Sequence, residues 1–173
     1  MTPVLVEKRP FSLGHRLNEK AGKRFALINK PIKQIHVSCG IIQQDDNILA
    51  VQRSDKMRLP LKWEFPGGKI ELGESPSECL QRELMEELDL HVLVGKPLNP
   101  LTHNYPTFIV TLYPFICTIE SGEITLHEHA AFAWLSPSKL PALDWAEADR
   151  PVLDAYLKIL EIQRSIKGDV PGS

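Results

Sequence analysis

The segment between residues 75 and 88 constrains the fold of this chain most strongly, because it specifies both where a helix begins and which face the helix buries. Ser75 suits the N-cap, Pro76 suits the first helical position, and Glu78 completes a capping box. An apolar stripe follows, in which leucines recur every four residues: Leu80, Leu84 and Leu88. The pattern predicts a helix over residues 76–88 with one face packed on a core.

Three glutamates on this predicted helix form a cluster that needs an explanation. Glu83, Glu86 and Glu87 are spaced at i, i+3 and i+4, so their side chains meet on one patch, where like charges repel by about 0.2–0.5 kcal/mol per pair. The helix dipole disfavours anions in the last turn, and the glutamates flank the leucine stripe at the edge of the core. A solvated acidic face is the ordinary interpretation of a charge run. A hard divalent cation, Mg²⁺ or Mn²⁺, accounts for all three features, and we favour it.

The rest of the chain predicts strands and one further helix. The expected strands cover residues 35–42, 48–52, 91–94, 108–119 and 131–135, and the first two flank a polar turn as a hairpin. Residues 59–68 are rich in Pro and Gly and predict a loop. A closing helix is expected over residues 148–162, with this apolar stripe: Val152, Leu153, Tyr156, Leu157 and Leu160. Strands with helices interspersed indicate an α/β domain in which a mixed sheet packs between helices.

The 173 residues suit one folded domain, which we place at residues 34–163, followed by a C-terminal tail at residues 164–173. Residues 1–33 form a basic N-terminal extension of unknown role, with eight Lys and Arg against two Glu. One interpretation is an arm that contacts an anionic partner or a neighbouring subunit. The other is an extension without a fixed structure.

Composition excludes several classes of protein. The formal net charge of −2 does not indicate a nucleic-acid binder, and no stretch approaches the roughly 18 apolar residues of a membrane span. Cys39, Cys79 and Cys117 lie far apart without a C-x-x-C spacing, which is typical of buried thiols in a reducing compartment. We therefore expect a cytoplasmic protein, monomeric or homodimeric, that binds neither a nucleic-acid polymer nor a membrane.

The histidines were weighed as a transition-metal site. His127 and His129 alternate around Glu128, so on a strand both imidazoles would share a face. No third ligand of the right type lies nearby in the sequence. We therefore interpret His91, His103, His127 and His129 as surface or loop histidines and not as zinc ligands.

Residues 68–90, GKIELGESPSECLQRELMEELDL, resemble the Nudix box, G-x5-E-x7-R-E-U-x-E-E-x-G-U, in which U is a bulky aliphatic residue. Eight of the nine defined positions match, and the exception is Asp89, where the family usually has Gly. This departure affects the C-terminal cap of the helix, where Asp is tolerated, and leaves the carboxylates intact. Residues 63–71, 127–129 and 133–137 are similar to the MutT and CTP pyrophosphohydrolase branch. The likeness covers about residues 35–160.

The resemblance implies a Nudix-type α/β/α sandwich with a mixed β-sheet between helices. By position it implies these metal ligands: the Gly67 carbonyl and the carboxylates of Glu83, Glu86, Glu87 and Glu128. It also implies that Glu74 and Arg82 orient the helix carboxylates through a buried ion pair, and that Arg53 contacts the substrate phosphates.

The activity that the resemblance implies is Mg²⁺-dependent hydrolysis of a nucleoside triphosphate at the β-phosphorus, which releases a monophosphate and pyrophosphate. Glu83 is our candidate for the general base. One alternative is a Nudix hydrolase of another nucleoside diphosphate derivative, such as a nucleotide sugar or a dinucleoside polyphosphate. A non-catalytic nucleotide-binding module is another, although such a module should have lost glutamates of the box. An RNA-binding domain would need a basic or aromatic surface that the sequence does not display.

The base-reading end of the site has three candidates. Asp149 matches a position that reads the nucleobase in the MutT branch, but by its place before a helix it is also a candidate N-cap. As an ionised acceptor it suits the cytosine amino group, so CTP, dCTP and modified pyrimidines are expected, with 8-oxo-dGTP as a further substrate. Phe65 and Tyr105 are candidates for stacking on the base, although core packing is the ordinary role of an isolated aromatic residue.

Overall fold

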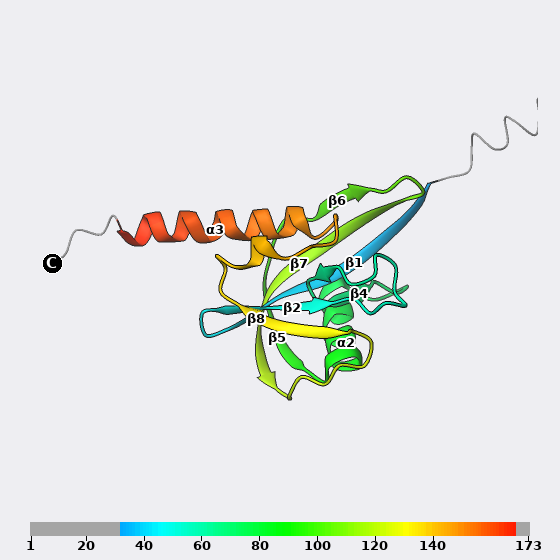
Figure 1. Cartoon of the computed structure of the whole chain (residues 1–173), viewed down its shortest axis with the longest axis horizontal. Coiled ribbons are helices and arrows are strands. Elements are labelled where there is room, and N and C mark those ends of the chain that lie inside the picture. The colour runs from blue at the N-terminus through cyan, green and yellow to red at the C-terminus, as the bar shows by residue number, and fades with distance from the viewer. Residues whose placement is uncertain (1–31, 169–173) are drawn as a thin grey trace, which may run out of the picture. The chain divides into compact units, whose positions relative to one another are not determined.

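The computed structural model describes residues 32–168, and Figure 1 shows the arrangement of its sheet and helices. The strands are β1 (Lys33–Gln44), β2 (Asn47–Gln52), β3 (Trp63–Glu64), β4 (Gly67–Lys69), β5 (His91–Pro97), β6 (Leu101–Asn104), β7 (Phe108–Ser121) and β8 (Ala131–Leu135). The helices are α2 (Pro76–Leu88), the 3₁₀ helix η1 (Leu140–Ala142) and α3 (Arg150–Gly168). The predicted basic extension lies outside the described residues, except for its last two.

The strands form one mixed sheet, as the sequence predicts. Its main order is β3-β2-β1-β7-β5, with β4 beside β1, β6 beside β7, and β8 beside β2. The long central strands β1 and β7 are parallel, and the other pairs are antiparallel. The predicted hairpin is present, because Gln44 at the end of β1 pairs with Asn47 at the start of β2.

Both faces of the central sheet are covered, which explains why its strands are almost continuously apolar. Successive side chains of a strand point to opposite faces. Ile41 accordingly packs in the cluster that includes α3, whereas Ile42 packs in the cluster that includes α2. In β2, Leu49 and Ala50 divide between the two clusters in the same way. The helices α2 and α3 therefore lie on opposite faces of the sheet (Figure 1), as an α/β/α sandwich requires.

Helix α2 has the bounds that the sequence predicts. The Ser75 side chain accepts a hydrogen bond from the Glu78 amide at 3.3 Å, and the Glu78 carboxylate accepts from the Ser75 amide at 2.8 Å, so the capping box is formed. All three leucines of the stripe are fully buried. At the other end, Asp89 is the C-cap in the left-handed conformation, with φ 56° and ψ 32°. This is the conformation for which the family usually uses Gly.

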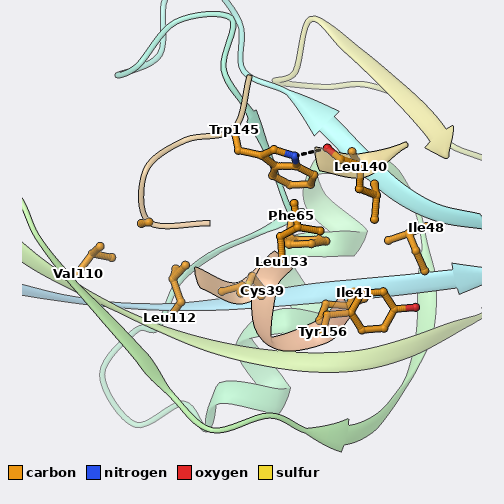
Figure 2. Close-up of a cluster of buried hydrophobic side chains, with 13 residues drawn as sticks. Cys39, Ile41, Ile48, Phe65, Val110, Leu112, Leu140, Trp145, Leu153 and Tyr156 are labelled. Atoms are coloured by element: carbon orange, nitrogen blue, oxygen red, sulfur yellow. Dashed lines mark hydrogen bonds between the residues drawn. The ribbon is translucent and has the colours of Figure 1, made fainter. Parts of the chain in front are cut away.

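The second core cluster lies between the sheet and α3 (Figure 2). Trp145 and Tyr156 are its largest buried side chains, and the Trp145 indole donates a hydrogen bond to the Leu140 carbonyl at 2.7 Å. The predicted stripe of the closing helix is confirmed, since its members are buried or packed against this cluster. The helix itself begins at Arg150 and continues to Gly168, beyond the predicted end at residue 162 and into the predicted tail.

Three short strands were not predicted. Strand β3 and the start of β4 lie within residues 59–68, where the sequence predicted only a loop, and β6 has no predicted counterpart. Each is stabilised by pairing with a longer neighbour, such as β7 for β6, and four or fewer residues carry too little alternation to be recognised. The three cysteines are buried free thiols, as expected. None of the helices within residues 32–168 is both long and apolar enough to cross a membrane.

Candidate functional site

The ion pair expected between Glu74 and Arg82 is present. Arg82 Nε lies 2.8 Å from Glu74 Oε1 and Nη2 lies 3.0 Å from Oε2, so the guanidinium engages both carboxylate oxygens. This pairing lowers the pKa of Glu74 to about 2. The resemblance implied a buried ion pair. The Arg82 and Glu74 side chains are 28% and 15% exposed, so the pair is only partly buried. It ties the loop that precedes α2 to the middle of the helix.

Arg82 also holds two glutamates of the cluster. Its Nη1 lies 3.1 Å from Glu83 Oε1 and 3.1 Å from Glu86 Oε2. The two carboxylates differ in exposure, since the Glu83 side chain is 14% exposed and that of Glu86 is 60% exposed. Burial raises the pKa of Glu83 above its ordinary value of 4.5, and the Arg82 charge opposes this rise. One arginine therefore orients three carboxylates on the same side of α2.

Glu87 is the most perturbed member of the cluster. The residue is only 8% exposed, and its Oε2 has no hydrogen-bond partner among the described residues. Burial, and after it the neighbouring charges of Glu83 and Glu128, raise the pKa of Glu87 to about 8. A buried carboxylate among other carboxylates is costly unless a positive charge compensates it.

Two glycines bring the β4 backbone against the helix. Gly67 has φ 145°, and a Cβ there would collide with the Ser38 carbonyl oxygen of β1. At Gly68 a Cβ would overlap the carboxylate of Glu83. Glycine is therefore required at position 67, where the obstacle is backbone, whereas a side chain at position 68 would displace the Glu83 carboxylate. The Gly67 backbone, expected to supply a metal ligand, lies one residue from this contact.

Glu128 lies on the loop between β7 and β8, which runs beside the C-terminal end of α2. The His127 amide donates to the Glu87 carbonyl at 3.1 Å, and the Thr125 amide donates to the Leu88 carbonyl at 3.0 Å. The charge of Glu128 acts on both Glu83 and Glu87. The resemblance implied that Glu128 shares a metal with the glutamates of α2, and its charge reaches Glu83 and Glu87 although 41 residues or more of chain separate it from them.

The donor set fits a hard divalent cation. Carboxylate and carbonyl oxygens are the ligands that Mg²⁺ and Mn²⁺ prefer, and a cation would favour the ionised form of the buried Glu87. Within residues 32–168, no three His, Cys, Asp or Glu side chains are arranged so that they could hold a metal ion. Glu83 and Glu86 are turned instead towards Arg82, the nearest compensating charge.

A cavity of about 850 Å³ lies along the face of β1 and β7. Its walls include the expected metal ligand Gly67. They also include all of the residues expected to contact substrate: Arg53, Phe65, Tyr105 and Asp149. The volume is in the range of small-molecule sites. Of the residues expected to bind the metal, Gly67 lines this cavity and the four carboxylates do not.

Arg53 is held by a buried polar chain that the sequence did not predict. Its Nε and Nη2 bond to Glu64 Oε2, the former at 2.8 Å, and its Nη1 donates to the Arg58 carbonyl at 2.7 Å. Glu64 Oε1 in turn lies 3.2 Å from His129 Nε2. The interpretation of His129 as a surface histidine is wrong, because its side chain is only 2% exposed. A charged residue between two aromatic ones, in Trp63-Glu64-Phe65, was the available signal for Glu64.

Asp149 points away from the helix that it precedes. Its Oδ1 accepts from the Phe65 amide at 3.0 Å, and within the described chain its side chain accepts from no amide in the first turn of α3. The residue is 5% exposed, and burial raises its pKa to about 8, with the charge of Glu64 as the next cause. The sequence argument assumed an ionised carboxylate. Burial corrects this, because near pH 7 the protonated form, which can donate as well as accept, predominates.

The two aromatic candidates lie in different surroundings. Phe65 is 2% exposed and packs on Trp145 with ring centroids 4.7 Å apart, so it belongs to the core as well as to the cavity wall (Figure 2). Tyr105 is partly exposed and stacks on Phe108 at 4.6 Å, beneath the Arg58 guanidinium, which lies 5.4 Å from the Phe108 ring. The Tyr105–Phe108 pair therefore offers the more accessible aromatic surface.

Comparison with known proteins agrees with this geometry. A model of the NUDIX domain matches residues 33–156. The CTP pyrophosphohydrolase of Escherichia coli is 34% identical over 128 residues, which cover 74% of this chain and 95% of that protein. The 8-oxo-dGTP diphosphatase of the same organism is 33% identical over 130 residues, covering 75% and 100%. The solution structure of the E. coli ORF135 protein has a TM-score of 0.65 at 34% identity and covers 74% of this chain and 91% of that one. This chain therefore belongs to the Nudix family of hydrolases, enzymes that act on acid anhydrides.

Proposed function

We propose that this chain is a Mg²⁺-dependent pyrophosphohydrolase, whose domain at residues 34–163 cleaves a nucleoside triphosphate into the monophosphate and pyrophosphate. The substrates that we infer are CTP, dCTP, modified pyrimidine nucleotides and oxidised nucleotides such as 8-oxo-dGTP. Two similar E. coli proteins support this choice, since one is named for CTP and the other for 8-oxo-dGTP. Such an activity removes unwanted nucleotides from the precursor pool. Mn²⁺ is the expected substitute for Mg²⁺.

The observation that carries the proposal is the state of Glu87. An oxygen of this buried carboxyl has no hydrogen-bond partner among the described residues, and burial and the charges of four further carboxylates raise its pKa. An ordinary structural role does not explain such an arrangement, because each of these charges destabilises the others. A divalent cation held by Glu83, Glu86, Glu87 and Glu128, with the Gly67 carbonyl, offsets that cost. When bound, it neutralises phosphate charge and lowers the pKa of a water ligand.

The residues around the cluster suit attack of water on the β-phosphorus. A bond forms between the water oxygen and that phosphorus, the bond from phosphorus to the α–β bridging oxygen breaks, and the bridging oxygen leaves with the monophosphate. Glu83 takes the proton of the water at Oε2, because its Oε1 is bonded to Arg82 at 3.1 Å. Burial raises the pKa of Glu83, which makes it a better proton acceptor.

Arg53 and Asp149 hold the two ends of the nucleotide. Arg53 uses three of its nitrogens on Glu64 and the Arg58 carbonyl, which leaves two of the five guanidinium N–H groups for a phosphate. At the other end of the cavity, a protonated Asp149 offers a donor and an acceptor side by side. This pair complements N3 and the amino group of cytosine, and equally O6 and N7–H of 8-oxoguanine. One protonated carboxyl therefore accommodates both proposed bases.

The test is hydrolysis of a panel of nucleotides in water enriched in ¹⁸O, with Mg²⁺ or with excess EDTA. We expect CTP, dCTP or 8-oxo-dGTP to be cleaved only with the metal, and the label to enter pyrophosphate. Release of orthophosphate, label in the monophosphate, or turnover in EDTA contradicts the proposal. The panel includes a nucleotide sugar and a dinucleoside polyphosphate, and a marked preference for either replaces the proposed substrate class.

A further inference from the structure

The loop that carries Glu128 is fixed to the C-terminal end of α2 along several contacts. Backbone hydrogen bonds join Thr125 to Leu88 and His127 to Glu87, at 3.0 and 3.1 Å. At the start of the loop, Gly122 has φ 106°, and a Cβ there would collide with the carbonyl oxygen at position 89. The path of the loop, and with it the position of Glu128, therefore depends on the geometry of the helix cap.

Asp89 adds a side-chain contact to this attachment. Its Oδ2 accepts a hydrogen bond from His127 Nε2 at 3.0 Å, and the two side chains are 42% and 46% exposed. The residue has φ 56°, a conformation in which a side chain is strained and glycine is not. This is also the one defined position of the Nudix box that the chain does not match. The chain thus has an aspartate where glycine would have less backbone strain, and its carboxylate contacts His127, the residue before Glu128.

A second histidine anchors the opposite side of the same glutamate. His129 Nε2 lies 3.2 Å from Glu64 Oε1, deep in the fold, and the Ala130 amide donates to the Gln52 carbonyl at 2.8 Å. Glu128 is therefore flanked by two imidazoles, each of which is bonded to a carboxylate of a different element.

We propose that Asp89 and His127 form a clasp that holds Glu128 over the carboxylates of α2, so that Asp89 is a positioning residue for the divalent cation. The inference rests on the proposed function, because Glu128 acts there as a cation ligand. Groups that orient metal ligands without touching the metal commonly change metal affinity 10- to 100-fold when they are removed. His129 shares this task, but it is buried, so its removal would disturb the fold as well.

The test measures Mn²⁺ affinity by electron paramagnetic resonance and thermal stability on the same full-length variants. Asp89→Gly restores the family residue, relieves the strained backbone and removes the clasp. We expect its Tm to equal or exceed that of wild type, while Mn²⁺ binding weakens by about 10- to 100-fold. Asp89→Asn removes the charge but keeps an acceptor for His127, and it should bind Mn²⁺ nearly as wild type does. A Tm and an affinity that move in opposite directions are not expected of a purely structural residue.

Asp45 provides a matched control, because it has the same left-handed conformation, with φ 53°, in the exposed β1–β2 turn. Asp45→Gly relieves similar strain far from the carboxylates and should leave Mn²⁺ affinity unchanged. In metal-free protein, hydrogen exchange of the Thr125 and His127 amides should accelerate several-fold in Asp89→Gly and not in Asp45→Gly. This second readout does not depend on the cation.

Two results overturn the clasp. Mn²⁺ affinity and amide exchange that are unchanged in Asp89→Gly refute it directly. A loss in Asp89→Asn as large as that in Asp89→Gly shows that the charge of Asp89 matters and its hydrogen bond does not. Failure of the proposed function looks different: wild type itself then binds no Mn²⁺, Glu128→Gln changes nothing, and the exchange experiment still decides whether the clasp exists.

Discussion

Replacement of Glu87 by glutamine should stabilise the metal-free protein, and the gain should depend on pH. The pKa of this carboxyl is about 8 in the fold, against 4.5 for an ordinary glutamate. The unfolded chain therefore releases the proton at lower pH than the folded chain does, and wild type loses stability as pH rises from 4.5 to 8. Each pH unit in this window corresponds to about 1.4 kcal/mol, so the cost at pH 7 is about 3 kcal/mol.

The glutamine side chain has nearly the same shape and no proton to release, so it avoids this cost. We expect Glu87→Gln and wild type to unfold with similar free energies near pH 4.5 in EDTA. At pH 7 the variant should be more stable by about 3 kcal/mol, and above pH 8 the difference should stay constant. Urea denaturation at pH 5, 7 and 8.5 measures it. The matched control is Glu161→Gln on the exposed surface of α3, which should show no such dependence.

Magnesium should narrow this difference in stability at pH 7. Wild type gains about 2.7 kcal/mol when the free cation is at 100 times its dissociation constant, whereas the variant binds more weakly and gains less. Turnover by the variant should fall by at least about 10²-fold, because a ligand of the catalytic metal is lost. The reasoning is refuted if the stability difference in EDTA is the same at pH 5 and pH 7. It is also refuted if the variant is the less stable protein at pH 7.

Three further substitutions test separate parts of the site. Gly68→Ala places a methyl group where the Glu83 carboxylate lies, so kcat should drop about 10²-fold or more in steady-state kinetics. A kcat within threefold of wild type would show that the contact between residue 68 and Glu83 does not matter for catalysis. Arg82→Lys cannot reproduce the two-pronged pairing with Glu74, so Mn²⁺ titration should show affinity about 10- to 100-fold weaker; wild-type affinity would mean that any cation suffices. Calorimetry of CMP binding to wild type should show about a tenfold loss between pH 7 and 9, as Asp149 gives up its proton. Asp149→Asn, which keeps a donor and an acceptor, should bind independently of pH, and parallel profiles refute this role.

Local signals carried much of what could be predicted. The bounds of α2 were correct because its start, its buried stripe and its cap are all set by residues within the helix or next to it. The strands of the central sheet were recognised for a similar reason, since burial on both faces makes each of them a continuous apolar run. The glutamates of α2 were identified by their helical spacing, and the partners implied by family resemblance, Glu74 and Glu128, lie close to them in space.

Elements that depend on distant partners were missed or misjudged. Strand β6 forms because it pairs with β7, and a segment of four residues is too short for its sequence pattern to predict that pairing. His129 lies in a loop, as one of the two expectations had it, but Glu64, 65 residues earlier in the chain, holds it in the interior and not at the surface. The raised pKa of Asp149 was not predicted. A pKa depends on burial and on the field of groups such as Glu64, and neither is visible along the chain.

The sequence by itself determined the helix with its acidic cluster, the mixed sheet and the family, because spacing along a helix or strand is a local property. Only the tertiary structure decided the raised pKa values of Glu87 and Asp149, the pairing of Arg53 with Glu64, and the contact between Asp89 and His127. The physical reason is the same in each case. Electrostatic energies depend on distance and on exclusion of water, and folding sets both by bringing together charges that lie far apart in the chain.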